Sequence, residues 1–332
     1  MMEQKYYNIP DGFNEDLKVF AGSSHPQLAR DICRELGIPL SETEIDRFPN
    51  DNLWVQIQEN SREKDVFVVQ TASPPVNEHM MELFLMIDAL KHASAHRVTV
   101  VMPYYAYVRS DKKDAPRISV AARLMADLME ASGADRLLTM NLHSGQVQGF
   151  FQVPADHLTA VPILCEYFRE KLHLDDPEIA KQFVVVAPDA GSAKRAGQYA
   201  QRLDLPLAVG DKRRIDSETV IMHGVVGDVE GKNIIIFDDE IATGGSVVQL
   251  VEMLKNDYEV GKIYAGAPHG ILVGPAIERF TNAPIEEIVV TDSLPLPNEK
   301  RIDKITQVSV APLLASAIYA IHTGESVSAL FD

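Results

Sequence analysis

The sequence predicts an α/β protein built from two similar domains, each with a mostly parallel sheet flanked by helices. Short runs rich in β-branched and aromatic residues alternate with helix-length amphipathic segments, which is typical of parallel sheets covered on both faces. The same alternation recurs in the second half of the chain. With 332 residues, the chain is also longer than one hydrophobic core usually requires, which favours two domains.

Strand-like and helical patterns can be placed in order along both halves. In the first half, strands are expected at 17–22, 53–58, 65–70, 97–103 and 136–142, and helices at 26–36, 77–93 and 118–132. In the second half, strands are expected at 183–188, 220–226, 233–239, 262–268 and 286–291, and helices at 158–172, 192–203, 245–257 and 312–322.

The polar, irregular stretch 173–182 is the best candidate for a surface excursion between the halves, so the boundary falls around 160–180. We place the domains at 1–165 and 166–332, with the last helix packing back on the first domain.

Composition and charge exclude several classes of protein. The apolar share of 46% and the charged share of 24% are typical of a soluble globular chain. A net charge of -17 argues against a general nucleic-acid binder, although local basic clusters can still hold a small anion. Cys33 and Cys165 are too few for a disulfide framework or a zinc site, which suits a reducing compartment. The sequence shows no signal-peptide pattern and no apolar segment of membrane-spanning length, so we expect a cytoplasmic protein without a membrane partner.

The segment 233–250 joins a short apolar run to adjacent carboxylates and a small-residue turn. Asp238 and Asp239 end the run, and Glu240 follows. Burying neighbouring carboxylates is costly unless cations or hydrogen-bond donors meet them, so a binding role is favoured over a solvated turn. Carboxylates accept hydrogen bonds from vicinal sugar hydroxyls, and a glycine loop that leads into a helix offers N–H groups to a phosphate. The loop consists of Thr243, Gly244, Gly245 and Ser246.

Two groups of polar side chains follow predicted strands in the first half, where ligands collect in open α/β sheets. Arg109 and Asp111 lie in a basic run after 97–103. Such a run fits either a nucleotide triphosphate or a solvated loop. His143 follows the strand at 136–142, and an isolated histidine is more often a structural hydrogen-bonding group than a ligand.

Two further groups lie in the second half. Asp189 follows the strand at 183–188, where a carboxylate can contact a hydrated Mg²⁺ or close an Asx turn before a helix. Lys212 and Arg214 belong to a short basic run in an acidic chain. Such a run is either an electrostatic clamp on a transferring phosphoryl group or a surface charge run.

The pattern at 233–246 resembles the sugar-phosphate signature of the type I phosphoribosyltransferase fold. Other segments, in the same order along nearly the whole chain, resemble the ribose-phosphate pyrophosphokinase family, also called phosphoribosyl pyrophosphate synthetases. Several motifs together are far more specific than any one of them. The segments are YYAYVRSDKKD (104–114), ADRLLTMNLHSGQVQGFF (134–151), VVVAPDAG (184–191), VGDKRR (209–214), FAGSSHPQLA near the start and VSVAPLLASAIYAIHTGESVSALF at the end.

This resemblance implies two type I phosphoribosyltransferase-like domains, the first on the ATP side and the second on the ribose 5-phosphate side. It implies transfer of the pyrophosphoryl group of Mg-ATP to the 1-hydroxyl of ribose 5-phosphate, which gives 5-phosphoribosyl 1-pyrophosphate and AMP for nucleotide biosynthesis. It also implies Mg²⁺ as cofactor beside His143 and Asp189, and dimers that assemble to a homohexamer.

Roles are carried over residue by residue from the matching motifs. The catalytic cations would be Lys212 and Arg214. ATP would be held by Phe48, Asn50, Asn52, Arg109, Asp111 and His143. Ribose 5-phosphate would be held by Asp238, Asp239, Thr243, Gly244, Gly245 and Ser246.

The chain departs from the family's pattern at several polar positions, which keeps two alternatives open. Asn50, Asn52 and Asn141 stand where acids are usual, and Ala242 stands where the sugar-phosphate loop commonly carries Asp. These changes would suit a catalytically weakened regulatory subunit of the same family. A nucleobase phosphoribosyltransferase is the second alternative, but it gives no reason for an adenine-stacking loop at Phe48.

Overall fold

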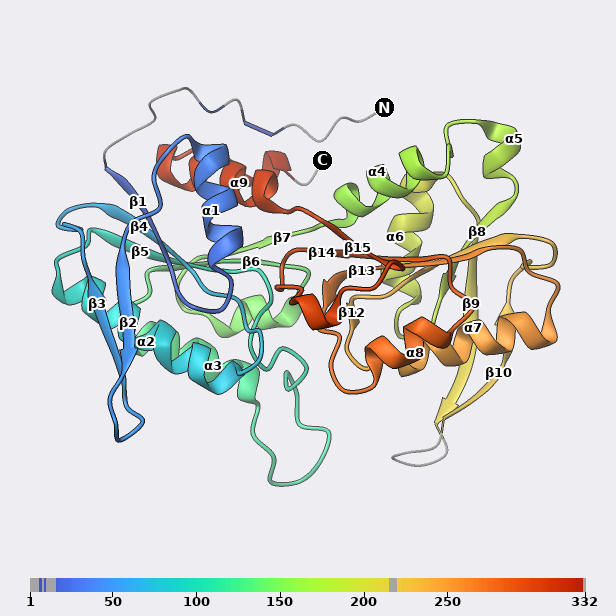
Figure 1. Cartoon of the computed structure of the whole chain (residues 1–332), viewed down its shortest axis with the longest axis horizontal. Coiled ribbons are helices and arrows are strands. Elements are labelled where there is room, and N and C mark those ends of the chain that lie inside the picture. Colours follow the sequence, from blue (N-terminus) through green and yellow to red (C-terminus); the bar gives the residue numbers. More distant parts are fainter. Residues whose placement is uncertain (1–5, 8, 10–15, 215–219, 331–332) are drawn as a thin grey trace. The chain divides into compact units, whose positions relative to one another are not determined.

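The computed structural model describes residues 6–7, 9, 16–214 and 220–330, without the side chains of 212–214 and 220–223 (Figure 1). The chain divides into two compact units. The first comprises the described residues of Met1–Thr159, Ser293–Pro295 and Val310–Asp332, and the second those of Ala160–Asp292 and Leu296–Ser309. The last long helix therefore belongs to the first unit.

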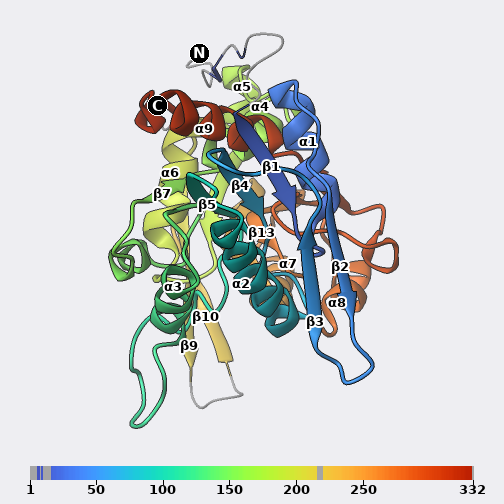
Figure 2. The same ribbon diagram turned by 90° about the vertical axis from the view of Figure 1, so that its left-hand side faces the viewer.

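The first unit is built on a five-stranded parallel sheet. Its elements are β1 (Leu17–Ala21), α1 (Pro26–Leu36), β2 (Thr43–Arg47), β3 (Leu53–Ile57), β4 (Asp65–Val69), α2 (Val76–His92), β5 (Arg97–Met102), α3 (Ala121–Ala131), β6 (Arg136–Met140), the 3₁₀ helix Gly145–Phe150, β7 (Ala155–Leu158), α9 (Ala311–Thr323) and the 3₁₀ helix Val327–Leu330. The strand order is β1-β4-β5-β6-β7. Helices α1 and α9 cover one face, and α2 and α3 cover the other (Figure 1). The antiparallel pair β2–β3 forms a separate ribbon beside the sheet (Figure 2).

The second unit repeats this architecture on a larger sheet. Its elements are α4 (Val161–Lys171), α5 (Pro177–Ala180), β8 (Phe183–Ala187), α6 (Ala193–Leu203), β9 (Leu207–Arg214), β10 (Val220–Val226), β11 (Asn233–Phe237), β12 (Glu240–Ile241), α7 (Gly245–Asp257), β13 (Ile263–Gly270), α8 (Ala276–Asn282), β14 (Glu287–Thr291), the 3₁₀ helix Asn298–Lys300 and β15 (Ile305–Val308). The order is β10-β9-β8-β11-β13-β14-β15, and β12 pairs with β13. Every pairing is parallel except that of β9 with β10. Helices α4 and α6 lie on one face, and α7 and α8 on the other (Figure 1).

The central strands are apolar because helices bury both of their faces. Every residue of β4, β8, β13 and β14 is buried, as expected for strands inside a covered parallel sheet. In the second unit, Phe237 at the end of β11 stacks on Tyr199 of α6, with ring centroids 3.9 Å apart and planes 7° apart. The predicted α/β class with mostly parallel sheets flanked by helices is confirmed.

The predicted strands and helices are present with ends shifted by a few residues, and several short elements were missed. The unpredicted elements are β2, β7, β9, β12, β15, α5, α8 and the 3₁₀ helices Gly145–Phe150, Asn298–Lys300 and Val327–Leu330. Most are only two to eight residues long and carry polar side chains, so they lack the apolar run by which a buried strand is recognised. The basic run that contains Lys212 and Arg214, for which no strand was predicted, belongs to β9.

The structure also tests the expectation of no membrane-spanning segment. Over the residues that it describes, none of the helices has both the length and the apolar character needed to cross a bilayer.

Candidate functional site

The acid pair of the sequence lies at the carboxyl end of β11, at the edge of the second unit's sheet. Phe237 is fully buried, and the Asp238 N–H donates to the Gly266 carbonyl at 3.2 Å. The next residue, Asp239, is 8% exposed. The buried strand therefore holds two carboxylates where ligands of open parallel sheets bind.

The two carboxylates affect each other's charge. Burial, together with the hydrogen bond and negative charge of Asp239, raises the pKa of Asp238 to about 8. The Asp239 N–H donates to Asp238 Oδ1 at 2.9 Å. Because two neighbouring carboxylates out of water cannot both ionise freely, the pair carries less than two negative charges near neutral pH. A cation or a set of sugar hydroxyl donors would favour the fully ionised form.

A partner of this pair, Arg195, escaped the sequence analysis. Arg195 lies on α6, and its Nη2 is 3.1 Å from Asp239 Oδ1. Its side chain is one-third exposed. In the sequence, Arg195 could have been found from its place in the first turn of the helix that follows Asp189. Because β8 and β11 are parallel neighbours, the helix that follows β8 lies near the acid pair that follows β11.

The loop after the acid pair has the geometry of an anion cradle. Gly244 has φ +71, and a Cβ on it would lie 2.6 Å from the Phe280 ring, so only glycine fits there. Arg279 Nη1 donates to the Thr243 carbonyl at 2.9 Å and fixes the loop from outside. Gly244 is the N-cap of α7. The first N–H groups of that helix therefore face the loop, where the helix dipole favours an anion.

Asp189 lies just after β8, next to β11 in the sheet. Its Oδ1 accepts from the Ser192 N–H at 3.0 Å, and Ser192 Oγ donates to the Asp189 carbonyl at 2.9 Å. One carboxylate oxygen therefore closes the turn into α6. This agrees with the second possibility for this residue, a turn that closes before a helix. Asp189 and the acid pair follow adjacent parallel strands, so both lie at the same edge of the sheet.

The first unit lacks this cradle at the corresponding place. There β4 is the neighbour of β1, as β11 is the neighbour of β8. Gln70 and Thr71 follow β4, and the turn into α2 carries Pro74 and Pro75 instead of glycines. Proline has no N–H to offer an anion. In addition, Gln70 Nε2 donates to the buried carboxylate of Glu82 at 2.7 Å. A sugar-phosphate cradle of this kind therefore fits the second unit.

The predicted nucleotide residues all lie in the first unit, and three of them share the turn between β2 and β3. Phe48 is 51% exposed, so its ring is not part of the hydrophobic core. Its N–H donates to the Asn52 carbonyl at 2.9 Å, and the Asn52 N–H lies 3.4 Å from Asn50 Oδ1. Arg47 at the end of β2 pairs with Asp51 and with Glu78 of α2. These contacts anchor the base of an exposed aromatic tip.

Asp111 and the segment of His143 are brought together by a residue that sequence analysis missed. Gln146, three residues after His143, donates from Nε2 to Asp111 Oδ2 at 3.0 Å. Asp111 is only 8% exposed, and His143 is half-buried. Arg109 is exposed. The structure therefore joins two of the predicted nucleotide segments.

The structure places the backbone of the two predicted catalytic cations. Lys212 and Arg214 lie on β9, paired with Met222 and Val220 of β10. The backbone at both positions therefore belongs to an antiparallel strand pair, which the sequence did not predict for β9. Residues 215–219 and the side chains of Lys212 and Arg214 lie outside the described part of the structure.

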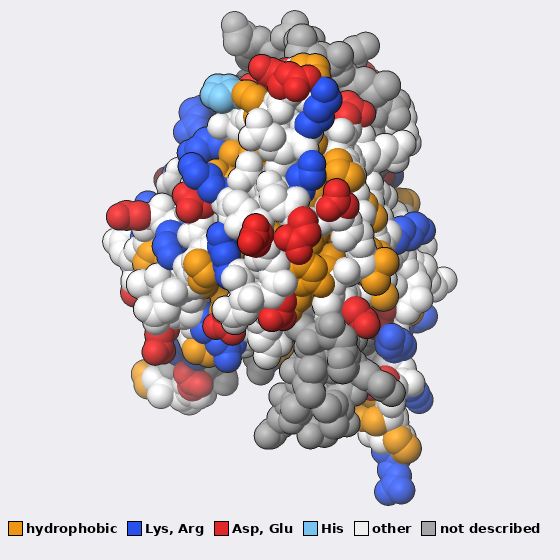
Figure 3. Space-filling model, turned by 90° about the vertical axis from the view of Figure 1, so that its right-hand side faces the viewer, with side chains coloured by type: hydrophobic (Ala, Val, Ile, Leu, Met, Phe, Trp, Pro, Cys, Tyr) orange, Lys and Arg blue, Asp and Glu red, His pale blue; other side chains and the backbone are white. Residues whose placement is uncertain are grey.

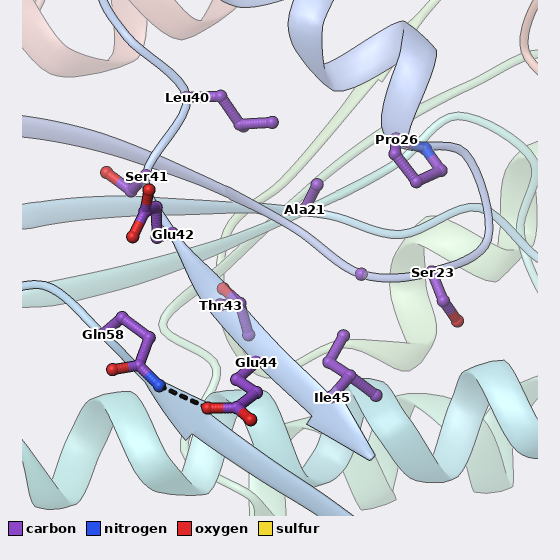
Figure 4. A pocket seen from close by; sticks show the side chains of 11 residues that line it. Ala21, Ser23, Pro26, Leu40, Ser41, Glu42, Thr43, Glu44, Ile45 and Gln58 are labelled. Atoms are coloured by element: carbon purple, nitrogen blue, oxygen red, sulfur yellow. Dashed lines mark hydrogen bonds between the residues drawn. The ribbon is translucent and has the colours of Figure 1, made fainter.

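A separate pocket of about 600 Å³ lies in the first unit (Figure 4). It is lined by the turn after β1 and by β2, including Ser23, Glu42 and Glu44. Gln58 Nε2 donates to Glu44 Oε2 at 2.8 Å within its lining. Its described lining contains two carboxylates and neither Lys nor Arg, which suits a polyphosphate poorly. None of the predicted site residues lines it.

An acid pair and a glycine cradle at the carboxyl edge of a parallel sheet define a class, the sugar-phosphate-binding α/β proteins. Comparisons with known proteins narrow this class. Residues 17–133 match the N-terminal domain of ribose phosphate pyrophosphokinase, 161–262 a phosphoribosyl transferase domain, and 217–332 a phosphoribosyl synthetase-associated domain.

The full-length relatives agree with these domain matches. The chain is 50% identical to a ribose-phosphate pyrophosphokinase of Deinococcus radiodurans, over 95% of this chain and 98% of that one. It is 47% identical to one of Caldanaerobacter subterraneus, over 96% and 99%. The crystal structure of phosphoribosylpyrophosphate synthetase from Mycobacterium smegmatis superposes with a TM-score of 0.86 at 38% identity, over 93% of this chain and 100% of that one. The chain belongs to the ribose-phosphate pyrophosphokinase family, and the family resemblance is confirmed.

Proposed function

We propose that this enzyme transfers the pyrophosphoryl group of Mg-ATP to the 1-hydroxyl of ribose 5-phosphate, which gives 5-phosphoribosyl 1-pyrophosphate and AMP. The observation that carries the proposal is the buried acid pair next to the Gly244 cradle, because together they match a sugar with adjacent hydroxyls and a terminal phosphate. Asp238 and Asp239 accept hydrogen bonds from the ribose hydroxyls. The loop from Thr243 to Ser246 holds the 5-phosphate.

ATP binds in this proposal to the first unit. Phe48 is exposed enough to stack on a base, and Asn50 and Asn52 offer neutral amide groups to the nucleoside. Arg109 neutralises phosphate charge, and the hydrogen bond from Gln146 holds the Asp111 carboxylate beside the segment of His143. The fit is supported by the position of these residues on two adjoining segments and one exposed turn.

A divalent cation fits the donor set of the chain. Among the described side chains, no group of three or more His, Cys, Asp or Glu forms a ready-made cage. Mg²⁺ keeps several waters and binds substrate phosphates with few protein ligands, so such a cage is not required. Burial and the neighbouring Asp239 raise the pKa of Asp238, and a cation beside the acid pair would favour its ionised form. His143 and Asp189 are the residues that we propose to contact Mg²⁺, which would neutralise the developing charge on the phosphates.

The remaining chemistry rests on alignment. The 1-hydroxyl oxygen of the sugar forms a bond to the β-phosphorus of ATP. The bond between that phosphorus and the oxygen that bridges the α- and β-phosphorus breaks, so this oxygen leaves on AMP, and the hydroxyl proton passes to water. Such transfers proceed through a loose transition state that needs alignment and charge neutralisation more than covalent help. We assign this neutralisation to Lys212 and Arg214, at the end of β9 next to 215–219.

The charge of the chain and its exposed apolar side chains indicate which partners other than the substrates it can have. The face shown in Figure 3 mixes acidic side chains with basic ones, and the net charge of -17 disfavours nucleic acid.

On α3, Leu124 is 47% and Leu128 is 38% exposed, and residues four apart share one face of a helix. This apolar face supports self-association, for which we propose dimers that assemble to a hexamer in the cytoplasm. Sedimentation of the wild type and of Leu124→Glu tests the assembly, and equal masses would contradict this role of the face.

The direct test follows the transferred atoms. With ATP labelled at the β-phosphorus, ribose 5-phosphate and Mg²⁺, the label should appear in 5-phosphoribosyl 1-pyrophosphate, with one AMP formed per product. Label released as free pyrophosphate would overturn the proposal. A folded protein that binds both substrates without turnover would indicate the regulatory subunit instead. That alternative is supported by four departures from the family's pattern, Asn50, Asn52, Asn141 and Ala242.

A further inference from the structure

Two hydrogen bonds to β7 hold the segment around His143 on both sides. On one side, the Leu142 N–H donates to Nε2 of His157 at 2.8 Å. On the other side, Gln148 Nε2 donates to the Ala155 carbonyl at 2.8 Å. Both acceptors belong to β7. This strand therefore borders the segment that carries His143, although no residue of the strand was assigned a role above.

The chain changes direction immediately before this contact. Asn141 has φ +44, in the left-handed region, which asparagine adopts more often than most residues with a side chain. Its N–H donates to the Leu158 carbonyl at 3.0 Å, which continues the pairing of β6 with β7 by one residue. A conformation of this kind persists only where its surroundings hold it. The bond from Leu142 to His157 comes at the next residue, so it is placed to hold the turn that aims His143.

The direction of this bond fixes the chemical state of the His157 ring. A backbone N–H can only donate, so Nε2 must be the unprotonated nitrogen and the ring proton must sit on Nδ1. Burial lowers the pKa of His157, which favours the neutral ring that this contact requires. Leu142 is itself only 7% exposed, so water is a poor substitute for the imidazole.

We propose that His157 is a positioning residue for the nucleotide: by accepting from the Leu142 N–H, it sets the direction in which His143 meets Mg-ATP. The inference rests on the proposed role of His143 in holding Mg-ATP. His157 does not touch the substrate in this scheme and acts only through the backbone at Leu142.

Two substitutions at His157 separate positioning from simple packing. His157→Leu removes the acceptor, whereas His157→Gln can place its Oε1 near the position of Nε2. We expect His157→Leu to raise the KM for ATP about tenfold and leave the KM for ribose 5-phosphate unchanged. His157→Gln should return the KM for ATP to within about threefold of the wild type. His96→Leu, at an exposed histidine of the same unit, is the matched control and should change neither constant.

The outcomes distinguish this inference from the function on which it rests. If His143→Ala weakens ATP and His157→Leu does not, or if the glutamine variant is no better than the leucine variant, the positioning role is wrong. A loss of melting temperature and of active fraction with both KM values unchanged would also overturn it. If His143→Ala leaves ATP binding and turnover unchanged, the proposed nucleotide role of His143 itself is wrong.

A measurement on the wild-type enzyme tests the bond even if the leucine variant does not fold. Residue-resolved hydrogen exchange should show the Leu142 amide protected in the folded enzyme without nucleotide, because its N–H is bonded and buried. Exchange of that amide at the rate of an unprotected peptide would overturn the inference.

Discussion

Replacing Asp238 with asparagine should make the ligand-free enzyme more stable and less able to bind ribose 5-phosphate. The pKa of Asp238 is about 8 in the folded chain, against an ordinary value of 3.8. Between these two values the folded chain holds a proton that the unfolded chain has lost. The stability that comes from this group is therefore fully present below the ordinary pKa and is lost as the pH rises through the folded value.

The size of the effect follows from the same linkage. Each pH unit in this window changes the free energy of unfolding by about 1.4 kcal/mol, so the window as a whole gives an upper bound of about 5–6 kcal/mol. Local relaxation and solvent reduce this bound, so we expect Asp238→Asn to gain about 1–3 kcal/mol near pH 8 and less near pH 5. Asparagine Oδ1 can still accept from the Asp239 N–H, so the local hydrogen bond is kept.

Urea denaturation of both proteins at several pH values measures the gain, and calorimetry measures the affinity for ribose 5-phosphate. Glu252→Gln, at an exposed carboxylate of α7, is the control and should stay within about 0.5 kcal/mol of the wild type at each pH. If Asp238→Asn is less stable than the wild type near pH 8, or if its gain does not depend on pH, the buried charge of Asp238 does not destabilise the folded enzyme as inferred. Unchanged affinity for the sugar would contradict its binding role.

Three further substitutions test the other parts of the site. Arg195→Met removes the cation next to Asp239, so it should destabilise the enzyme by about 1–3 kcal/mol. The loss should be larger near pH 8 than near pH 5, and denaturation at the two pH values measures it. Equal losses at both would refute the charge argument. Lys212→Ala should lower kcat by at least about a hundredfold with little change in Tm; a large stability loss with a small kinetic loss would show a structural lysine. Gly244→Ala should raise the KM for ribose 5-phosphate and cost about 1–3 kcal/mol, because its Cβ would meet an aromatic ring and its φ is positive. Gly37→Ala, also at positive φ but with open space around it, should cost about 1 kcal/mol without changing that KM.

The sequence predicted the fold where apolar runs are long and failed where they are short. Strands such as β4 and β8 are buried on both faces, and their continuous apolar character cannot be mistaken. The segment of β2, TEIDR, is polar and largely exposed, and β7, ADHL, has four residues. Both become strands through pairing with a neighbour, and a local pattern does not contain that information.

The sequence predicted the site in part, for a related reason. The acid pair and the glycine loop are adjacent in sequence, so one segment reveals both. Arg195, Gln146 and His157 act on residues of other elements, and only the arrangement of strands and helices brings them there. For Lys212 and Arg214, the sequence predicts a role and the structure gives the backbone, whose strand conformation was not expected.

The placement of α9 affects the order in which the chain can fold during synthesis. Asp65 in β4 binds Arg97 of β5 at 2.8 Å and His322 of α9 at 2.7 Å, and Arg97 also donates to the Ile321 carbonyl. A ribosome delivers α9 long after the five strands of the sheet. Until then, that face of the sheet has α1 but not α9, and the Asp65 carboxylate lacks its histidine. A nascent chain released before α9 should therefore be a substrate for chaperones and proteases, even though its sheet is already encoded in full.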